Sequence, residues 1–150
     1  MAQILLLNGP NLNLLGEREP EIYGRTTLKE IEARVTAKAA GAGHRCDCFQ
    51  SNHEGQLIDW LHEKRSANFL LLNAGGLTHT GIALRDAVAA IDTPFVEIHI
   101  SNIYRREPFR ARSYFSDLAV GLIVGLGPQG YEFAAEFAIN HLARAGEVAG

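Results

Sequence analysis

The run Phe69-Leu70-Leu71-Leu72, followed by Asn73, decides the fold class of this 150-residue chain. Four consecutive apolar residues leave a strand without a polar face, so both of its faces must be covered. Strands of this kind are typical of parallel sheets that carry helices on either side. The run therefore predicts a buried strand inside an α/β sheet.

Four further β-rich apolar runs predict the rest of the sheet, because turn-forming residues bound each of them. The expected strands are Gln3 to Leu7, Arg45 to Gln50, Asn68 to Leu72, Pro94 to Ile100 and Ala119 to Gly125. Amphipathic segments alternate with them and predict helices over Thr27 to Ala40, after Ser51, over Ile82 to Ile91 and over Pro128 to Ala143. The first two begin with the capping-box patterns Thr27-x-x-Glu30 and Ser51-x-x-Glu54. This alternation predicts one α/β domain over residues 1–150, a three-layer, flavodoxin-like, doubly wound fold with a five-stranded parallel sheet.

Composition and charge limit the possible partners. The chain is 47% hydrophobic with a net charge of -3, so no basic surface is expected to attract nucleic acid or an anionic membrane. The early apolar run Ile4 to Leu7 is too short for a signal peptide or a membrane span. Cys46 and Cys48, two residues apart in one strand, are poorly placed to form a disulfide. We therefore expect a cytoplasmic protein with reduced thiols.

Polar residues gather where three predicted strands end, and ligands of open α/β sheets bind at these carboxyl ends. They are Asn8, Asn11, Asn13, Arg18 and Tyr23 after the first strand, Asn73, Gly75, Gly76, Thr78 and His79 after the third, and Glu97, His99, Ser101 and Asn102 around the end of the fourth. The connection from Ser101 to Asp117 carries Pro108 and four arginines and predicts a functional loop rather than a helix.

The fourth strand places Phe95, Glu97, His99 and Ser101 on one face, because side chains alternate along a strand. A carboxylate inside a parallel strand needs a hydrogen-bonding partner. Fixing His99 or a water would supply one, which makes His99 a candidate functional residue.

Tyr23 on its own is typical of a surface-loop aromatic residue, but Arg18 and Arg25 lie close to it in sequence. A nearby cation favours the phenolate, and lowering a tyrosine pKa from about 10 to near 7 takes roughly 4 kcal/mol. Tyr23 is therefore a candidate base.

Alternative chemistries find less support. The motif Gly125-x-Gly127-x-x-Gly130 suggests nucleotide or flavin binding, but no strand follows it, and a tight strand-to-helix turn explains it equally well. His44, Cys46 and Cys48 share a strand face, yet no CxxC pair accompanies them, so we expect no metal site. A receiver domain needs acidic residues at the first and third strand ends, where this chain has Asn8 and Asn73, so that alternative is not supported. A Schiff-base mechanism is also disfavoured, because no lysine lies at a predicted strand end.

Five segments of the chain resemble type II 3-dehydroquinate dehydratase. They are Leu7 to Gly16, Arg18 with Tyr23-Gly24, Gln50 to Gly55, Asn73 to Thr80 and Glu97 to Asn102. The resemblance implies a lyase that converts 3-dehydroquinate to 3-dehydroshikimate and water by anti elimination through an enol or enolate, without metal or cofactor. The reaction serves the shikimate pathway or quinate breakdown. The departures from the family pattern are Ala74, Gly76 and Arg25.

The resemblance also assigns roles to residues. It implies that Tyr23 removes the C2 proton beside Arg18, that His99 protonates the departing C1 hydroxyl, that Asn11 holds a water near the enolate oxygen and that Glu97 orients His99. It further implies that Asn73 and the amides of Ile100 and Ser101 bind the substrate carboxylate. His79 and Arg110 are expected to hold the ring hydroxyls, and Arg106 to close over the site. The resemblance also implies a dodecamer built of trimers, in which Asp86 reaches the site of a neighbouring subunit. The segment Arg18 to Tyr23, flanked by Gly16 and Gly24, is expected to act as a lid, and Asn8 to Asn13 as a fixed wall.

Overall fold

Five parallel strands form one sheet in the computed structural model, which describes residues 1–149 apart from the side chains of residues 22, 23, 148 and 149. The strands are β1 (Gln3–Asn8), β2 (Arg45–Gln50), β3 (Phe69–Asn73), β4 (Phe95–His99) and β5 (Gly121–Val124). Their order in the sheet is β2-β1-β3-β4-β5, with every neighbouring pair parallel. The predicted five-stranded, doubly wound α/β fold is confirmed.

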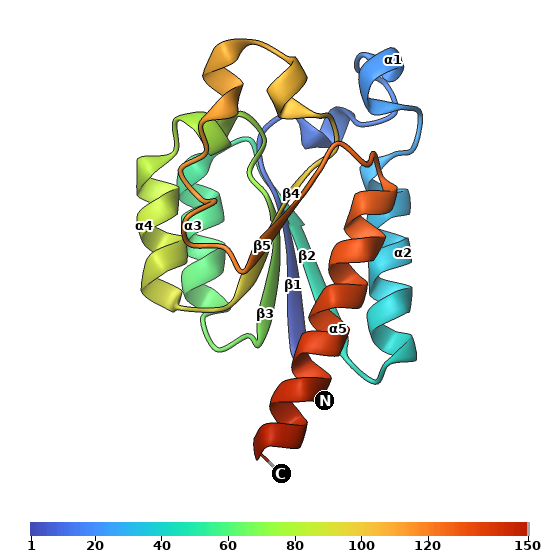
Figure 1. Ribbon diagram of the computed structural model, residues 1–150, viewed down its shortest axis with the longest axis vertical. Coiled ribbons are helices and arrows are strands. Elements are labelled where there is room, and N and C mark those ends of the chain that lie inside the picture. The colour runs from blue at the N-terminus through green and yellow to red at the C-terminus, as the bar shows by residue number, and fades with distance from the viewer. Residues whose placement is uncertain (150) are drawn as a thin grey trace.

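Helices cover both faces of the sheet and make the three layers (Figure 1). On one face lie α2 (Leu28–Gly41) and α5 (Gln129–Ala149), and on the other lie α3 (Glu54–Glu63) and α4 (Ile82–Ile91). The short helix α1 (Pro20–Tyr23) stands beyond the carboxyl ends of the strands, at the end of the molecule opposite the two termini. No helix within residues 1–149 is long and apolar enough to span a membrane.

The core consists of two apolar clusters, one between the sheet and each helical layer. Leu6 and Leu71 pack toward α2 and α5, whereas Leu5 and Leu70 pack toward α3 and α4. All four side chains are fully buried. Alternate residues of β1 and of β3 thus pack against opposite helical layers. Both faces of these strands must be apolar for this reason, as expected from the sequence.

The start of α2 follows its sequence signal. The Thr27 hydroxyl accepts a hydrogen bond from the Glu30 backbone amide at 3.2 Å, and the Glu30 carboxylate accepts one from the Thr27 amide at 3.4 Å. This reciprocal capping box confirms the prediction for Thr27.

The second predicted capping box, Ser51-x-x-Glu54, is wrong. Helix α3 begins at Glu54 without a side-chain cap, and the Ser51 hydroxyl donates to the Gln56 side chain instead. The Glu54 carboxylate accepts from the Leu84 amide at 3.0 Å, in the first turn of α4, where the N-cap residue Gly81 has no side chain to offer. Glu54 thus caps a neighbouring helix, which the local sequence pattern could not indicate.

The connection between β4 and β5 contains only the short 3₁₀ helices η3 (Ile103–Arg105) and η4 (Pro108–Ala111). This agrees with the expectation of a loop rather than a helix, while the function of the loop stays a prediction. It arches over the carboxyl ends of the strands, at the same end of the molecule as α1 (Figure 1). Helix α5 is longer than predicted and runs on to Ala149.

Candidate active site

A cleft of about 140 Å³ opens at the carboxyl ends of β1, β3 and β4. Its polar lining contains most of the residues expected from the sequence: Asn11, Arg18, Asn73, His79, His99, Ser101, Arg106 and Arg110, with Ile100 beside them. Its apolar wall is formed by Leu12, Leu14, Leu15 and Ile103. Three arginines and two histidines thus line one cleft. Because the net charge of the chain is -3, an anionic ligand would be attracted by these local side chains and not by the overall charge of the protein.

His99 and Glu97 form a buried pair at the floor of the cleft. The His99 Nε2 atom lies 2.5 Å from Glu97 Oε2, and the two side chains are 6% and 1% exposed. The other carboxylate oxygen, Glu97 Oε1, accepts a hydrogen bond from the Ser116 hydroxyl at 2.7 Å. Burial raises the pKa of Glu97, but the hydrogen bonds from His99 and Ser116 and the charge of His99 outweigh it, so the pKa is lowered overall. An ionised carboxylate accepts the Nε2 proton, which leaves Nδ1 as the ring nitrogen that can serve a ligand.

A hydrogen-bonded group of three buried side chains joins β1, β3 and α5 beneath the cleft. The Tyr131 hydroxyl donates to Asn8 Oδ1 at 2.6 Å and accepts from Asn73 Nδ2 at 2.7 Å. Asn73 Oδ1 accepts in turn from the Gly75 amide at 3.1 Å. Asn73 is therefore held by both of its side-chain polar atoms while it lines the cleft.

The loop after β1 is fixed by contacts with its neighbours. The Gly9 amide donates to the Asn73 carbonyl at 2.8 Å, and a Cβ atom on Gly9 would lie only 2.2 Å from the Ala74 carbonyl oxygen. On the other side, the Asn52 side chain accepts from the Asn11 amide at 2.9 Å, which holds Asn11 in a left-handed conformation with φ of 71°. Only glycine permits the close approach at position 9.

The remaining polar residues of the cleft have polar neighbours on the loops. Arg106 Nη1 donates to the Ser101 hydroxyl at 3.3 Å, and Arg110 Nε donates to Glu107 at 3.2 Å. His79 Nδ1 lies 2.7 Å from the Arg112 carbonyl oxygen. The segment from β4 to β5 thus brings two cationic side chains over the floor that His99 forms.

Two of the expected site residues, Glu97 and Asp86, are described and do not line the cleft. Glu97 lies behind His99, and Asp86 is exposed on α4, away from the cleft. Tyr23 is the last residue of α1, and its side chain lies outside the described part of the structure.

The glycine motif of β5 and α5 forms a strand-to-helix turn. The amides of Gly125 and Gly127 donate to the carbonyls of His99 and Ile100, both at 3.0 Å, so these two groups are already used within the protein. Phosphate groups are bound by amides that remain available, which disfavours the nucleotide alternative.

The cysteine strand face packs inward. Cys46 and Cys48 are free thiols packed against the cluster beneath α2 and α5. His44 accepts a hydrogen bond from the Ala2 amide. Among the described residues, no three histidine, cysteine or acidic side chains are grouped to hold a metal ion.

The sequence did not single out Tyr131 or Ser116. Tyr131 occupies the apolar stripe of α5 with Ala134, Ala135 and Ala138, and a phenol in such a stripe needs a partner, which was a usable signal. Ser116 gives no comparable signal, because its partner Glu97 is distant in sequence and faces it only after β4 and the following loop have folded.

Comparison with known proteins gives consistent matches over most of the chain. A family model described as "Dehydroquinase class II" matches residues 2–139. A 3-dehydroquinate dehydratase of Laribacter hongkongensis is 57% identical over 144 residues, covering 95% of this chain and 93% of that protein. A catabolic 3-dehydroquinase of Verticillium alfalfae is 53% identical over 142 residues, covering 94% and 95% of the two chains. The crystal structure of type II dehydroquinase from Butyrivibrio crossotus matches with a TM-score of 0.88 and 37% identity, covering 91% of this chain and 97% of that one.

Proposed function

The chain belongs to the class II dehydroquinase family, and from that premise we propose that it removes water from 3-dehydroquinate to give 3-dehydroshikimate. The observation that supports this best is the cleft itself. It places the His99–Glu97 pair beneath three arginines, at the strand ends where α/β domains bind small ligands. A substrate with one carboxylate and a leaving hydroxyl fits such a set of groups.

The reaction has two steps. Tyr23, as phenolate, takes the proton from C2, and the electrons of the C2–H bond form an enolate with the C3 carbonyl. The C1–O bond then breaks, C1 and C2 become doubly bonded, and the hydroxyl leaves as water with a proton from His99. Arg18 stabilises the phenolate and the charge that develops in the transition state.

The other residues of the cleft bind and orient the substrate. Asn73 and the amides of Ile100 and Ser101 hold the carboxylate, while His79 and Arg110 hold ring hydroxyls. Asn11 positions a water near the enolate oxygen, and Arg106 closes over the ligand. Support for these roles comes from their position, since each of these residues lines the cleft.

The segment from Arg18 to Tyr23 acts as a lid that brings base and cation together over the substrate. Support comes from its two ends, because Gly16 and Gly24 have φ values of 90° and 78°. Such left-handed positions allow a loop to turn sharply on either side of a short helix.

We further propose that residues 1–150 act as one catalytic domain in the cytoplasm, as a homododecamer built of trimers. Asp86 would then complete a neighbouring subunit's site. Its exposure on α4, outside its own cleft, is what such a role requires. The two free thiols suit a reducing compartment.

An absorbance assay tests the proposed activity. The product is a conjugated enone that absorbs in the ultraviolet, whereas the substrate is not conjugated. Protein treated with EDTA and incubated with 3-dehydroquinate should produce this absorbance at the same rate as untreated protein. Folded protein that produces no absorbance would refute the dehydratase activity, and a rate abolished by EDTA would refute the metal-free mechanism.

A further inference from the structure

Both oxygens of the Glu97 carboxylate are used, and only one of them serves His99. Oε2 lies 2.5 Å from His99 Nε2, and Oε1 accepts from the Ser116 hydroxyl at 2.7 Å. The Glu97 side chain is 1% exposed, so water cannot readily replace either partner. The direction of the carboxylate, and with it the orientation of the imidazole, therefore depends on Ser116.

The turn that carries Ser116 is itself held from within. The Ser113 hydroxyl accepts from the amides of Phe115 and Ser116 at 3.0 and 3.3 Å. Phe115, between these serines, is fully buried in the core cluster beneath α3 and α4. The two hydrogen bonds and the buried Phe115 side chain thus stabilise this turn.

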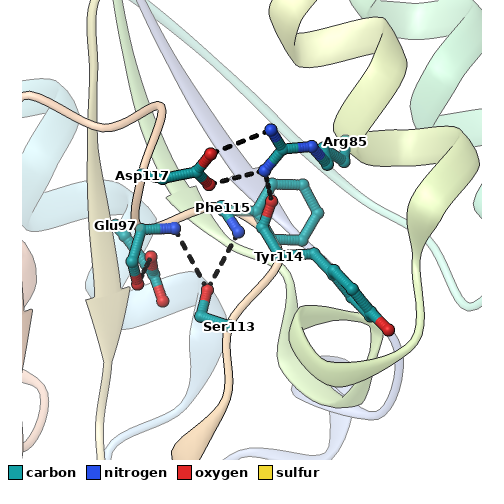
Figure 2. Close-up of polar contacts among 7 residues, drawn as sticks. Arg85, Glu97, Ser113, Tyr114, Phe115 and Asp117 are labelled. Carbon is teal, nitrogen blue, oxygen red and sulfur yellow. Dashed lines mark hydrogen bonds and ion pairs between the residues drawn. The ribbon is translucent and has the colours of Figure 1, made fainter.

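The same turn is also held from α4. Arg85 donates both of its terminal nitrogens to the Asp117 carboxylate, at 2.5 and 2.9 Å, and one of them also donates to the Tyr114 carbonyl at 2.7 Å (Figure 2). A bidentate guanidinium–carboxylate pair fixes direction as well as distance. Arg85 therefore holds the residues on both sides of Phe115 and Ser116.

We propose that Ser116 is a positioning residue of the dehydratase, which holds Glu97 so that His99 faces the leaving hydroxyl, and that the Arg85–Asp117 pair keeps Ser116 in place. The inference rests on the proposed function. Neither Ser116, Arg85 nor Asp117 lines the cleft, so all three act on the reaction through Glu97.

Replacing Ser116 separates positioning from substrate binding. In Ser116→Ala, kcat should fall roughly ten- to a hundredfold, a part of the 10²- to 10⁴-fold that general acid catalysis contributes, while KM changes little. Removing the Ser116 donor also raises the pKa of Glu97, so the acid limb of the kcat profile should move to higher pH. Ser116→Thr, which retains the hydroxyl, should restore both values toward those of the wild type.

Controls make the result decisive. Ser66→Ala, at an exposed serine outside the turn, should leave kcat and its pH profile unchanged. If Ser116→Ala does not fold, as judged by its melting temperature, Ser116→Cys is measured in its place, because it keeps a side-chain donor that is weaker than the hydroxyl. Wild-type turnover is measured first, because an inactive wild type refutes the proposed function, whereas an active wild type with an unaffected Ser116 variant refutes only this inference.

The contribution of Arg85 is tested with a double-mutant cycle. If Arg85 acts through Ser116, Arg85→Ala should lower kcat in the wild type and have little further effect in Ser116→Ala. Independent, multiplicative losses would show that the Arg85–Asp117 pair does not hold Ser116, and no loss in Arg85→Ala alone would show the same.

Discussion

Single residues set the chemistry of the cleft. His99 is neither a solvated nor a simply packed histidine, because its Nε2 atom is committed to a buried, ionised carboxylate. The sequence could predict this pairing, since Glu97 and His99 lie two residues apart on one face of a strand. It could not predict Ser116 as the third member, since that contact depends on the tertiary fold.

Replacing either of the two residues proposed to transfer protons should slow the reaction strongly without unfolding the protein. Tyr23→Phe and His99→Ala are each expected to lower kcat by about 10²- to 10⁴-fold, because each removes a proton donor or acceptor from the transition state. Steady-state rates give kcat, and circular dichroism confirms the fold. Near-normal turnover in a folded variant would refute the role of that residue.

The Glu97 carboxylate should make stability depend on pH. Its pKa is lowered in the folded protein, so its contribution is complete above the unfolded value of about 4.3 and is lost as pH falls through the folded value. The difference in unfolding free energy between wild type and Glu97→Gln should therefore shrink as pH falls from 7 toward about 3. Urea denaturation measures it, with exposed Glu136→Gln as the control. A difference that is constant or grows toward acid would contradict this assignment.

At the scale of secondary-structure elements, local signals predicted most of what the structure shows. The five strands and the capping box of α2 depend on nearby residues and were predicted correctly. The capping box at Ser51 failed because Glu54 has its partner on α4, thirty residues away along the chain. The sequence pattern Ser/Thr-x-x-Glu therefore does not by itself establish a capping box, because the box also requires the glutamate to bond back to the N-cap amide.

The side-chain hydrogen bonds that join α5 to Asn8 and Asn73, at the ends of β1 and β3, both involve the Tyr131 hydroxyl. Tyr131→Phe should lower the free energy of unfolding by about 1–3 kcal/mol, because Asn8 and Asn73 each lose a buried hydrogen-bonding partner. Urea denaturation of the variant measures this change. Phe133→Leu, at a partly exposed position of the same helix, provides a matched control. An unchanged stability for Tyr131→Phe would show that the three buried side chains do not stabilise the junction.

On the scale of the whole molecule, the proposed role of the exposed Asp86 requires an oligomer, because its side chain would complete the active site of a neighbouring subunit. We predict that sedimentation gives a mass of twelve 16.4-kDa chains. In Asp86→Ala, KM should rise without loss of the assembly, because the side chain is expected to complete a neighbour's site rather than to hold the interface. A monomer that is fully active at assay concentrations would contradict both expectations.

The stereochemistry of proton removal tests the proposed roles of Tyr23 and His99 most directly. Tyr23 and His99 lie on different elements at the strand ends, α1 and β4. The anti elimination that the family resemblance implies would take the C2 hydrogen on the face opposite the leaving hydroxyl. Substrate with deuterium at that C2 position should give 3-dehydroshikimate without deuterium, as measured by mass spectrometry. A product that retains the deuterium would show that the hydrogen on the same side as the hydroxyl is removed, and would contradict the proposed roles of Tyr23 and His99.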